Sequence, residues 1–208
     1  MNKAVSEMRK RHLDKAEAML RELAGKTPVD WKASSTSNDT LYCAFWDAGE
    51  AQQCREQNPN RTIIPVYPSY AHVFYLLGFI RMEKGDAGNA LKELNAALAL
   101  EPDHPVILIE KGTALAQLKR HQEAYDCFVL AEKQHYASTT SIKARALRSQ
   151  GVTLIDLNRL DEAERCFERS LELVPDNKLA WNEIEYIRRI RSGASSSGND
   201  VEIRKVKE

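Results

Sequence analysis

Small and large apolar residues recur along the chain at spacings that predict helices in pairs. Three glycines, Gly78, Gly112 and Gly151, are each followed by an alanine twelve positions later and by a leucine or phenylalanine four positions beyond that. The first two copies are 34 residues apart, and the third follows 39 residues after the second with the internal spacing kept. Periods of this length are typical of stacked helical hairpins, which bury their apolar faces against their neighbours. The pattern therefore predicts an all-α protein built from repeated hairpins.

Three repeat units follow from this spacing, over residues 71–104, 105–138 and 144–176. Each unit is expected to hold two helices, separated by turn residues such as Lys84-Gly-Asp. The predicted helices span residues 69–84, 87–100, 105–118, 121–134, 139–157 and 161–174.

The segments on either side of the repeats resemble incomplete units. In residues 1–28, Ala16, Leu20 and Leu23 fall at i, i+4 and i+7, which is the stripe of a helix with one buried face. Residues 177–192 predict one more helix, which would cap the apolar end of the stack.

Two segments lack the repeat pattern. Residues 29–70 form an insert, in which we expect one apolar helix over about 39–57 and a proline-rich connection through Pro65 and Pro68. The final residues, 193–208, have the composition of a disordered tail. The insert is rich enough in apolar residues to pack against another part of the chain.

The composition argues against several classes of partner and site. Thirty basic and thirty acidic side chains leave no net charge that would attract nucleic acid or anionic lipid. No apolar stretch of signal-peptide type begins the chain and no run reaches the roughly 18 apolar residues of a membrane helix, so we expect a cytoplasmic protein. The cysteines form no CxxC pair, the histidines show no metal spacing, and no catalytic set can be assembled. We therefore expect a non-catalytic protein without cofactor or metal.

The residues shared by the three units resemble the tetratricopeptide repeat. Its pattern has an aromatic residue or leucine, a glycine four positions on, then alanine, a large apolar residue, alanine and a closing proline. The matching residues are Phe74, Leu77, Gly78, Ala90, Leu94, Ala97 and Pro102; Leu108, Gly112, Leu115, Ala124, Phe128 and Ala131; and Leu147, Gly151, Leu154, Ala163, Phe167 and Pro175. Tyr136 replaces the closing proline of the second unit. The resemblance implies a right-handed superhelix of stacked helix–turn–helix hairpins, to which the irregular insert and the capping helix are added.

The resemblance also implies a concave groove, lined by the first helix of each hairpin, that binds a peptide or a helix of a partner protein. The positions that face this groove by repeat register are Tyr75, Leu76, Phe79, Met82, Ile109, Glu110, Thr113, Arg145, Arg148, Ser149, Val152, Asn182 and Tyr186, together with His72, Val106, Glu183 and Arg189. The groove is thus expected to be apolar and aromatic near Tyr75 and Phe79 and basic near Arg145 and Arg148. We expect its ligand to be a protein segment with apolar anchors and an acidic group.

Several interpretations of this groove stay open. The insert could bury Tyr75 and Phe79 beneath Trp46 or Ile63 and so fill the groove from within the chain. A binding protein of this type could be an adaptor, a chaperone that shields an apolar segment of one client, or the regulatory module of an enzyme system. Homo-oligomerisation through the convex face is a further alternative.

One mode of binding known in this family does not fit the residues present. Co-chaperones that hold the C-terminal carboxylate of heat-shock chaperones use Lys and Asn on one first helix, Asn on the next, and Lys and Arg on the third. The corresponding positions here hold Tyr75 and Phe79, then Glu110, then Arg145 and Ser149. Only Arg145 conforms, and Glu110 would repel a carboxylate. A register that starts one unit earlier stays an alternative, because the first 28 residues are degenerate.

Overall fold

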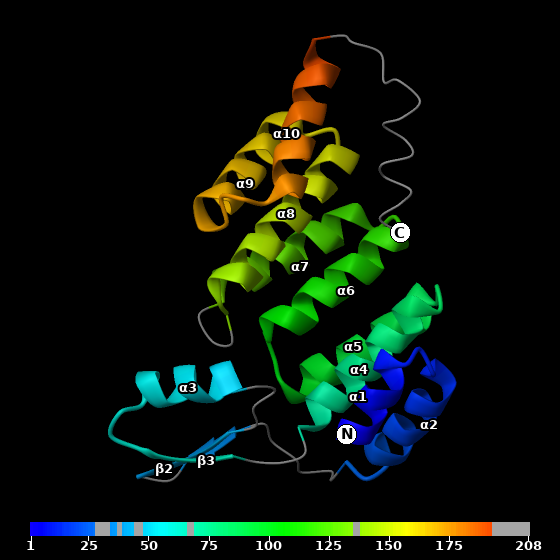
Figure 1. The fold of residues 1–208 in the computed structure, drawn as a ribbon, viewed down its shortest axis with the longest axis vertical. Coiled ribbons are helices and arrows are strands. Elements are labelled where there is room, and N and C mark those ends of the chain that lie inside the picture. The colour runs from blue at the N-terminus through cyan, green and yellow to red at the C-terminus, as the bar shows by residue number, and fades with distance from the viewer. Residues whose placement is uncertain (28–33, 37–38, 44–47, 66–68, 135–137, 193–208) are drawn as a thin grey trace.

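The computed structural model describes residues 1–27, 34–36, 39–43, 48–65, 69–134 and 138–192 of the chain (Figure 1). The predicted all-α architecture of stacked helical hairpins is confirmed. The helices of the described part are α1 Asn2–Arg9, α2 Leu13–Ala24, α3 Ala48–Gln57, α4 Tyr70–Glu83, α5 Ala87–Leu100, α6 Pro105–Gln117, α7 His121–Lys133, α8 Thr140–Asp156, α9 Leu160–Leu173 and α10 Lys178–Arg191. The tail over 193–208, which was expected to be disordered, lies outside the described residues.

The three repeat hairpins are α4–α5, α6–α7 and α8–α9, and each is closed by contact between a glycine and a large apolar side chain. A Cβ atom on Gly112 would lie 2.5 Å from Phe128 Cε1, and one on Gly151 would lie 2.6 Å from Phe167 Cζ. The leucine of the first hairpin does the same, since a Cβ on Gly78 would lie 2.8 Å from Leu94 Cγ. Glycine is therefore required because the second helix of each hairpin approaches this close.

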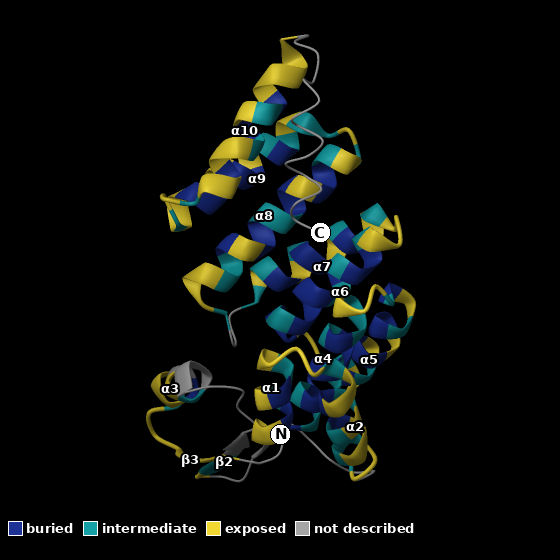
Figure 2. Cartoon of the chain, turned by 45° about the vertical axis from the view of Figure 1, so that its right-hand side comes forward, coloured by how far each residue is buried: buried dark blue, intermediate teal, exposed yellow. Residues whose placement is uncertain are grey.

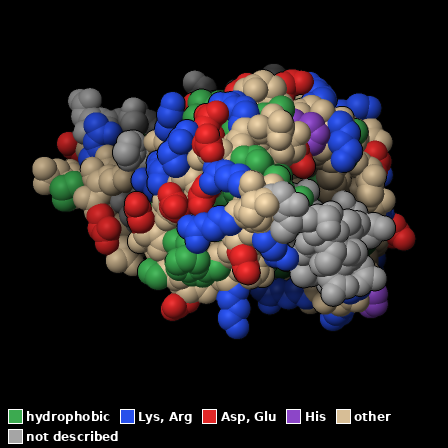
Figure 3. All heavy atoms as spheres, turned by 90° about the horizontal axis from the view of Figure 1, so that it is seen from above, with side chains coloured by type: hydrophobic (Ala, Val, Ile, Leu, Met, Phe, Trp, Pro, Cys, Tyr) green, Lys and Arg blue, Asp and Glu red, His purple; other side chains and the backbone are tan. Residues whose placement is uncertain are grey.

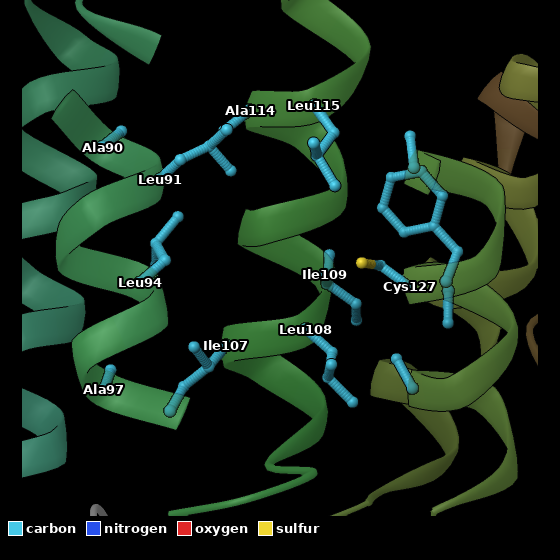
Figure 4. Close-up of a cluster of buried hydrophobic side chains, with 14 of the residues drawn as sticks. Ala90, Leu91, Leu94, Ala97, Ile107, Leu108, Ile109, Ala114, Leu115 and Cys127 are labelled. Atoms are coloured by element: carbon cyan, nitrogen blue, oxygen red, sulfur yellow. The ribbon is translucent and has the colours of Figure 1, made fainter. Parts of the chain in front are cut away.

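The buried residues lie where the helices face one another, and the exposed residues lie on the outer faces of the helices (Figure 2). Between α5 and α6, Leu91 and Leu94 pack with Ile107, while Cys127 of α7 lies on the other side of α6 (Figure 4). At the C-terminal end, Ala180, Ile184 and Ile187 of α10 are buried against α9.

The hairpin turns share one backbone geometry that extends to the N-terminal segment. Arg11, Gly85, Lys119 and Asn158 all have positive φ, and each stands two residues before the second helix of its hairpin. In every turn the following N–H donates to a carbonyl five residues back, as His12 N does to Glu7 O at 3.0 Å. This is the Schellman type of helix ending. Residues 1–27 thus form a hairpin with the same turn as the three units, and α2 packs on α4.

The insert is built differently from our expectation of a helix over 39–57. The helix α3 begins only at Ala48, and Thr40–Cys43 is a strand, β2. It pairs antiparallel with β1, Ser34–Thr36, and parallel with β3, Thr62–Pro65, in the order β1-β2-β3. The isoleucines of β3 and the Thr-Leu-Tyr run of β2 favour extended backbone once they can pair, so a partner distant in sequence decides the conformation.

The described residues of the insert form a small core of their own. Leu41 stands opposite Ile63 in the register of β2 and β3, and both pack with Ala51 and the buried Cys54 of α3. In Figure 1 the strands and α3 lie to one side of the helical stack. Trp46, considered above as a side chain that could cover the groove, lies outside the described residues.

No helix of the described part is both long and apolar enough to cross a membrane. The acidic and basic side chains on the face seen from the α10 end are interspersed, rather than gathered into one charged patch (Figure 3).

Candidate functional site

A pocket of about 410 Å³ opens on the face formed by α6, α8 and α10, the first helices of the second and third hairpins and the cap. Its floor is made by Phe128 and Phe167, the aromatic side chains that close the hairpins from α7 and α9. The same repeated contact that holds each hairpin together therefore also shapes the bottom of the pocket. The remaining lining residues are Thr113, Ala116, Arg145, Arg148, Ser149, Val152, Thr153, Leu179 and Glu183.

The residues expected from the repeat register divide into three groups. Six of them line this pocket, and these are Thr113, Arg145, Arg148, Ser149, Val152 and Glu183. Three others are buried and lie outside the pocket lining, and these are Leu76, Ile109 and Glu110. The rest also lie outside the pocket lining, and these are His72, Tyr75, Phe79, Met82, Val106, Asn182, Tyr186 and Arg189.

Sequence reasoning missed Ala116 and Thr153 on the first helices, Leu179 on α10 and the aromatic floor. The register signal for Leu179 was present, because it lies four residues before Glu183 on the same side of α10. Phe128 and Phe167 were recognised only as core residues, since a pattern of spacings does not show that one edge of a buried ring faces a cavity.

The basic character predicted for the end of the groove near Arg145 and Arg148 is partly neutralised by an ion pair. Arg145 Nη2 donates to Glu110 Oε1 at 2.5 Å, which joins α8 to α6. Glu110 is buried, so the pair is shielded from solvent on the carboxylate side. Burial, and then the charge of Glu110, raise the pKa of Tyr75 to about 12, which keeps this phenol neutral beside the pair.

Arg148 is the cation of the pocket that keeps its charge available. Its Nη1 donates to the Ser170 hydroxyl oxygen at 3.3 Å, and among the described residues no carboxylate lies within 4.0 Å of it. Burial, and then the nearby Arg145, lower the pKa of this guanidinium, although arginine stays charged at any physiological pH. A half-buried cation without a counter-ion favours binding of an anionic group from a ligand.

The aromatic end of the predicted groove is packed more closely than the pocket. Tyr75 contacts the clusters on both sides of α4, and its ring stands 5.9 Å from that of His72. Phe79 is half-buried on the same helix. The described residues of the insert pack chiefly on one another, through Cys54 and Ile63.

The reactive side chains of the described part are dispersed. Cys54, Cys127 and Cys166 are buried, and burial raises the pKa of both Cys127 and Cys166. No group of three His, Cys, Asp or Glu side chains that could hold a metal ion occurs among the residues the structure describes. The arrangement is suited to binding through shape and charge.

Two sequence models described as the tetratricopeptide repeat match the chain, over residues 75–128 and 144–177. Among curated proteins, the probable biofilm formation methyltransferase WspC of Pseudomonas putida is 37% identical over 70 residues, which are 34% of this chain and 16% of that protein. The mouse RNA polymerase II-associated protein 3 is 29% identical over 117 residues, which are 56% of this chain and 17% of that protein. The chain thus spans less than a fifth of either relative.

Solved structures agree with the sequence matches. The first tetratricopeptide domain of Spaghetti (RPAP3), bound to an HSP90 peptide, is 27% identical with a TM-score of 0.53, covering 59% of this chain and 93% of that one. The MamA structure has a TM-score of 0.63 over 93% of this chain and 86% of that chain, and its 15% identity makes it evidence for the fold alone. The repeated residues, the hairpins that they form and these matches lead to one conclusion: the chain contains tetratricopeptide repeats, over residues 75–128 and 144–177.

Proposed function

We propose that this protein is a non-catalytic, cytoplasmic interaction scaffold that holds a segment of a partner protein in the pocket between α6, α8 and α10. The observation that carries the proposal is the pocket itself, which joins apolar walls to a cation, Arg148, that lacks an ion-pair partner in the described part of the chain. The relative bound to an HSP90 peptide supports peptide binding as a property that this fold can provide.

The ligand that fits these walls carries an acidic group beside an apolar side chain. Val152 of α8 and Leu179 of α10 are 42% and 45% exposed, so each offers apolar surface that a ligand would remove from water. A carboxylate that reaches Arg148 would form a charge-assisted hydrogen bond in a half-buried site, where such bonds are strongest. The apolar and acidic contacts therefore come from one pocket rather than from opposite ends of the groove.

The Glu110–Arg145 pair supports a ligand that is not a C-terminal carboxylate of the heat-shock type. Arg145 is the one position that conforms to that clamp, and its guanidinium is already engaged by a buried carboxylate. An incoming carboxylate would have to displace Glu110 and leave it buried without a partner, which is costly. An internal acidic side chain directed to Arg148 avoids this cost.

The experiment selects peptides from a phage-displayed random 12-residue library on the wild-type chain and measures their binding by calorimetry. We expect the selected peptides to carry an acidic residue next to an apolar one, and Arg148→Glu to weaken their binding by about ten- to a hundredfold. Arg165→Glu on α9 is the matched control, because Arg165 is exposed and lies outside the pocket lining, and it should change binding less than twofold. Equal binding to wild type and Arg148→Glu would contradict the proposal.

A second candidate is a chaperone that shields an apolar segment of one client, which the exposed Val152 and Leu179 favour. For the two variants it predicts the opposite order of effects, in which Phe79→Glu abolishes binding and Arg148→Glu hardly changes it.

The match to part of a methyltransferase favours a third role, as the regulatory module of an enzyme system. A module of that kind would bind its enzyme through the same pocket, so the Arg148 variant tests it too.

A further inference from the structure

The last helix, α10, presents two different apolar faces. Ala180, Ile184 and Ile187 are buried against α9 and complete the stack. A second row on the groove side contains Leu179, Glu183, Tyr186 and Ile190, at spacings of four, three and four residues. Leu179 is 45% exposed and Ile190 41%, so both ends of this row keep apolar surface in contact with solvent.

Spacings of four, three and four are those of the d, a, d and a positions in a heptad repeat. Such a row lies along one side of a helix and packs against a second helix rather than against an extended strand. From Leu179 to Ile190 the row spans twelve residues, and the eleven steps between its ends cover about 16 Å at 1.5 Å per residue, which is about three helical turns. Resting on the proposed function, we infer that this row is a docking seam for an amphipathic α-helix of a partner protein that places a basic residue opposite Glu183.

The choice of a basic residue follows from charges that the pocket leaves without counter-ions. Glu183 and Arg148 both line the pocket, and they do not pair with each other within 4.0 Å. Among the described residues, neither Glu183 nor Arg148 has an ion-pair partner. A partner helix with a base and an acid four residues apart carries both complementary charges on one face. A charged residue at an a position also fixes register and partner choice in helix pairs.

The wall opposite the seam belongs to α8, where Val152 is 42% exposed and lines the same pocket. A helix on the seam would therefore contact α10 along its length and α8 through Val152. Side chains of the incoming helix would enter the pocket between the two, as ridges fit into grooves.

The other exposed face of α10 does not suit a partner helix in the same way. Trp181 is 55% exposed, but its indole N–H already donates to Pro175 O at 3.0 Å. Four residues on, the position that is glycine in each repeat, as in Gly151, is Glu185. A side chain there blocks the close approach of a second helix that the glycines permit. This face therefore lacks the fit for a further helix, whereas Leu179 and Ile190 of the seam expose apolar surface.

The test uses three synthetic 21-residue peptides measured by fluorescence anisotropy on the full chain. Each has leucine at its a and d positions except for a central a position, which is lysine in the first peptide, with glutamate four residues away. The second peptide has glutamate in place of that lysine, and the third keeps the lysine but has a central proline that breaks the helix. We expect the lysine peptide to bind at least tenfold more tightly than either of the others.

The variant Glu183→Lys should reverse the preference between the lysine and glutamate peptides. The matched control Glu185→Lys changes an exposed glutamate two residues away on the other side of α10, and it should leave the preference unchanged. Three results would overturn the inference of a docking seam. The wild type could bind neither the lysine nor the glutamate peptide, Glu183→Lys could leave the preference between them unchanged, or the proline peptide could bind as tightly as the lysine peptide. A wild-type dimer by light scattering that Ile190→Asp dissociates would make a second copy the occupant, and would also overturn it.

Failure of the seam and failure of the proposed function give different results. Library peptides that depend on Arg148, together with helical peptides that ignore Glu183, would leave the proposed function intact and remove the seam. Helical peptides that depend on Glu183, with all binding unaffected by Arg148→Glu, would support the seam and contradict the acidic contact of the proposed function.

Discussion

Two joints of the helical stack, the one between α8 and α9 and the one between α2 and α4, differ in how much charge is added to their packing. In the C-terminal hairpin, α8 and α9 meet where the ring of Phe167 lies against Gly151, and shape complementarity dominates. The N-terminal hairpin α1–α2 also meets α4 through an apolar cluster, in which Ala16 and Leu20 pack with Leu77 and Ile80, but ion pairs lie around this cluster.

The ion pairs of the N-terminal end centre on Glu17 of α2. Its carboxylate accepts from Arg81 Nη2 at 2.5 Å and from Lys84 Nζ at 2.7 Å, both at the end of α4. Arg21 of the same helix reaches Glu93 of α5 at 2.7 Å. The Glu17 side chain is only 14% exposed, so its pairs are less screened by water than ordinary surface pairs.

This difference teaches that joints in one repeat architecture can rest on packing alone or on packing supplemented by ion pairs, and that the two kinds respond to different changes. A contact between helices that rests on packing is weakened by substitutions that change the volume of its side chains. Ion pairs between helices are weakened by higher salt or by a change in pH that neutralises one partner. The joint between α2 and α4 should therefore be weakened by high salt or acid, while the joint between α8 and α9 responds mainly to changes in side-chain volume.

The largest expected effect is the loss of a packed joint. Phe167→Ala should lower the free energy of unfolding by about 3–5 kcal/mol, because a buried ring and its contacts are lost. Gly151→Ala should lower it by about 1–3 kcal/mol, because the new Cβ would stand 2.6 Å from the Phe167 ring. Urea denaturation followed by circular dichroism measures both changes.

The control for this joint is Gly88→Ala, where nothing lies within 4 Å of the new Cβ, and it should be neutral or stabilising by up to about 1 kcal/mol. A double-mutant cycle separates contact from helix propensity: with Phe167→Leu present, Gly151→Ala should cost at least about 1 kcal/mol less. If Gly151→Ala lowered the free energy of unfolding equally with Phe167 and with Phe167→Leu, contact with the Phe167 ring would not be the reason for glycine at position 151.

The same contrast explains how much of the fold could be predicted from the sequence. The three hairpins were predictable because glycine, alanine and a large apolar residue recur at fixed spacing, and packing requires that repetition. The turns were less visible, since Arg11, Lys119 and Asn158 adopt positive φ without being glycine. The strand Thr40–Cys43 was predicted as helix, because its conformation depends on pairing with Thr62–Pro65 across the intervening helix.

For the candidate site, the repeat register identified the helix faces but not the location of the pocket. Val152 and Arg148 could be placed because successive first helices present equivalent positions to one side. The pairing of Glu110 with Arg145 could not, since it depends on side-chain conformations of two helices. Because Arg145 is paired with Glu110, Arg148 is the arginine of the pocket whose charge has no carboxylate partner among the described residues.

A smaller effect is expected when the ionic joint is weakened. Glu17→Gln should lower the free energy of unfolding by about 1–2 kcal/mol, because Arg81 and Lys84 lose a shared counter-ion. The loss should shrink as sodium chloride rises from 50 to 500 mM, since salt already screens these charges in the wild type. Urea denaturation at the two salt concentrations measures this, and hydrogen exchange should locate the change in α1 and α2.

The matched control for Glu17 is Glu22→Gln on the same helix, which breaks an exposed pair with Lys26 and should cost no more than about 0.5 kcal/mol. If Glu17→Gln were no more costly than Glu22→Gln at low salt, the ionic description of this joint would be wrong. A loss of protection spread over α8 and α9 would count against a joint that opens locally.

The smallest expected effect is a pH dependence within the N-terminal hairpin, at the turn between α1 and α2. Hydrogen bonds from His12, then Lys15, then Lys10 lower the pKa of Glu7 to about 2. Because the folded pKa lies below the unfolded value of about 4.5, the stabilisation is complete above pH 4.5 and is lost as pH falls towards 2. Hydrogen exchange of α1 and α2 between pH 6 and 2 should show wild-type protection declining towards that of Glu7→Gln, which lacks the titrating group. A constant difference between the two proteins over this range would mean that Glu7 supports the turn only as a neutral hydrogen-bond acceptor.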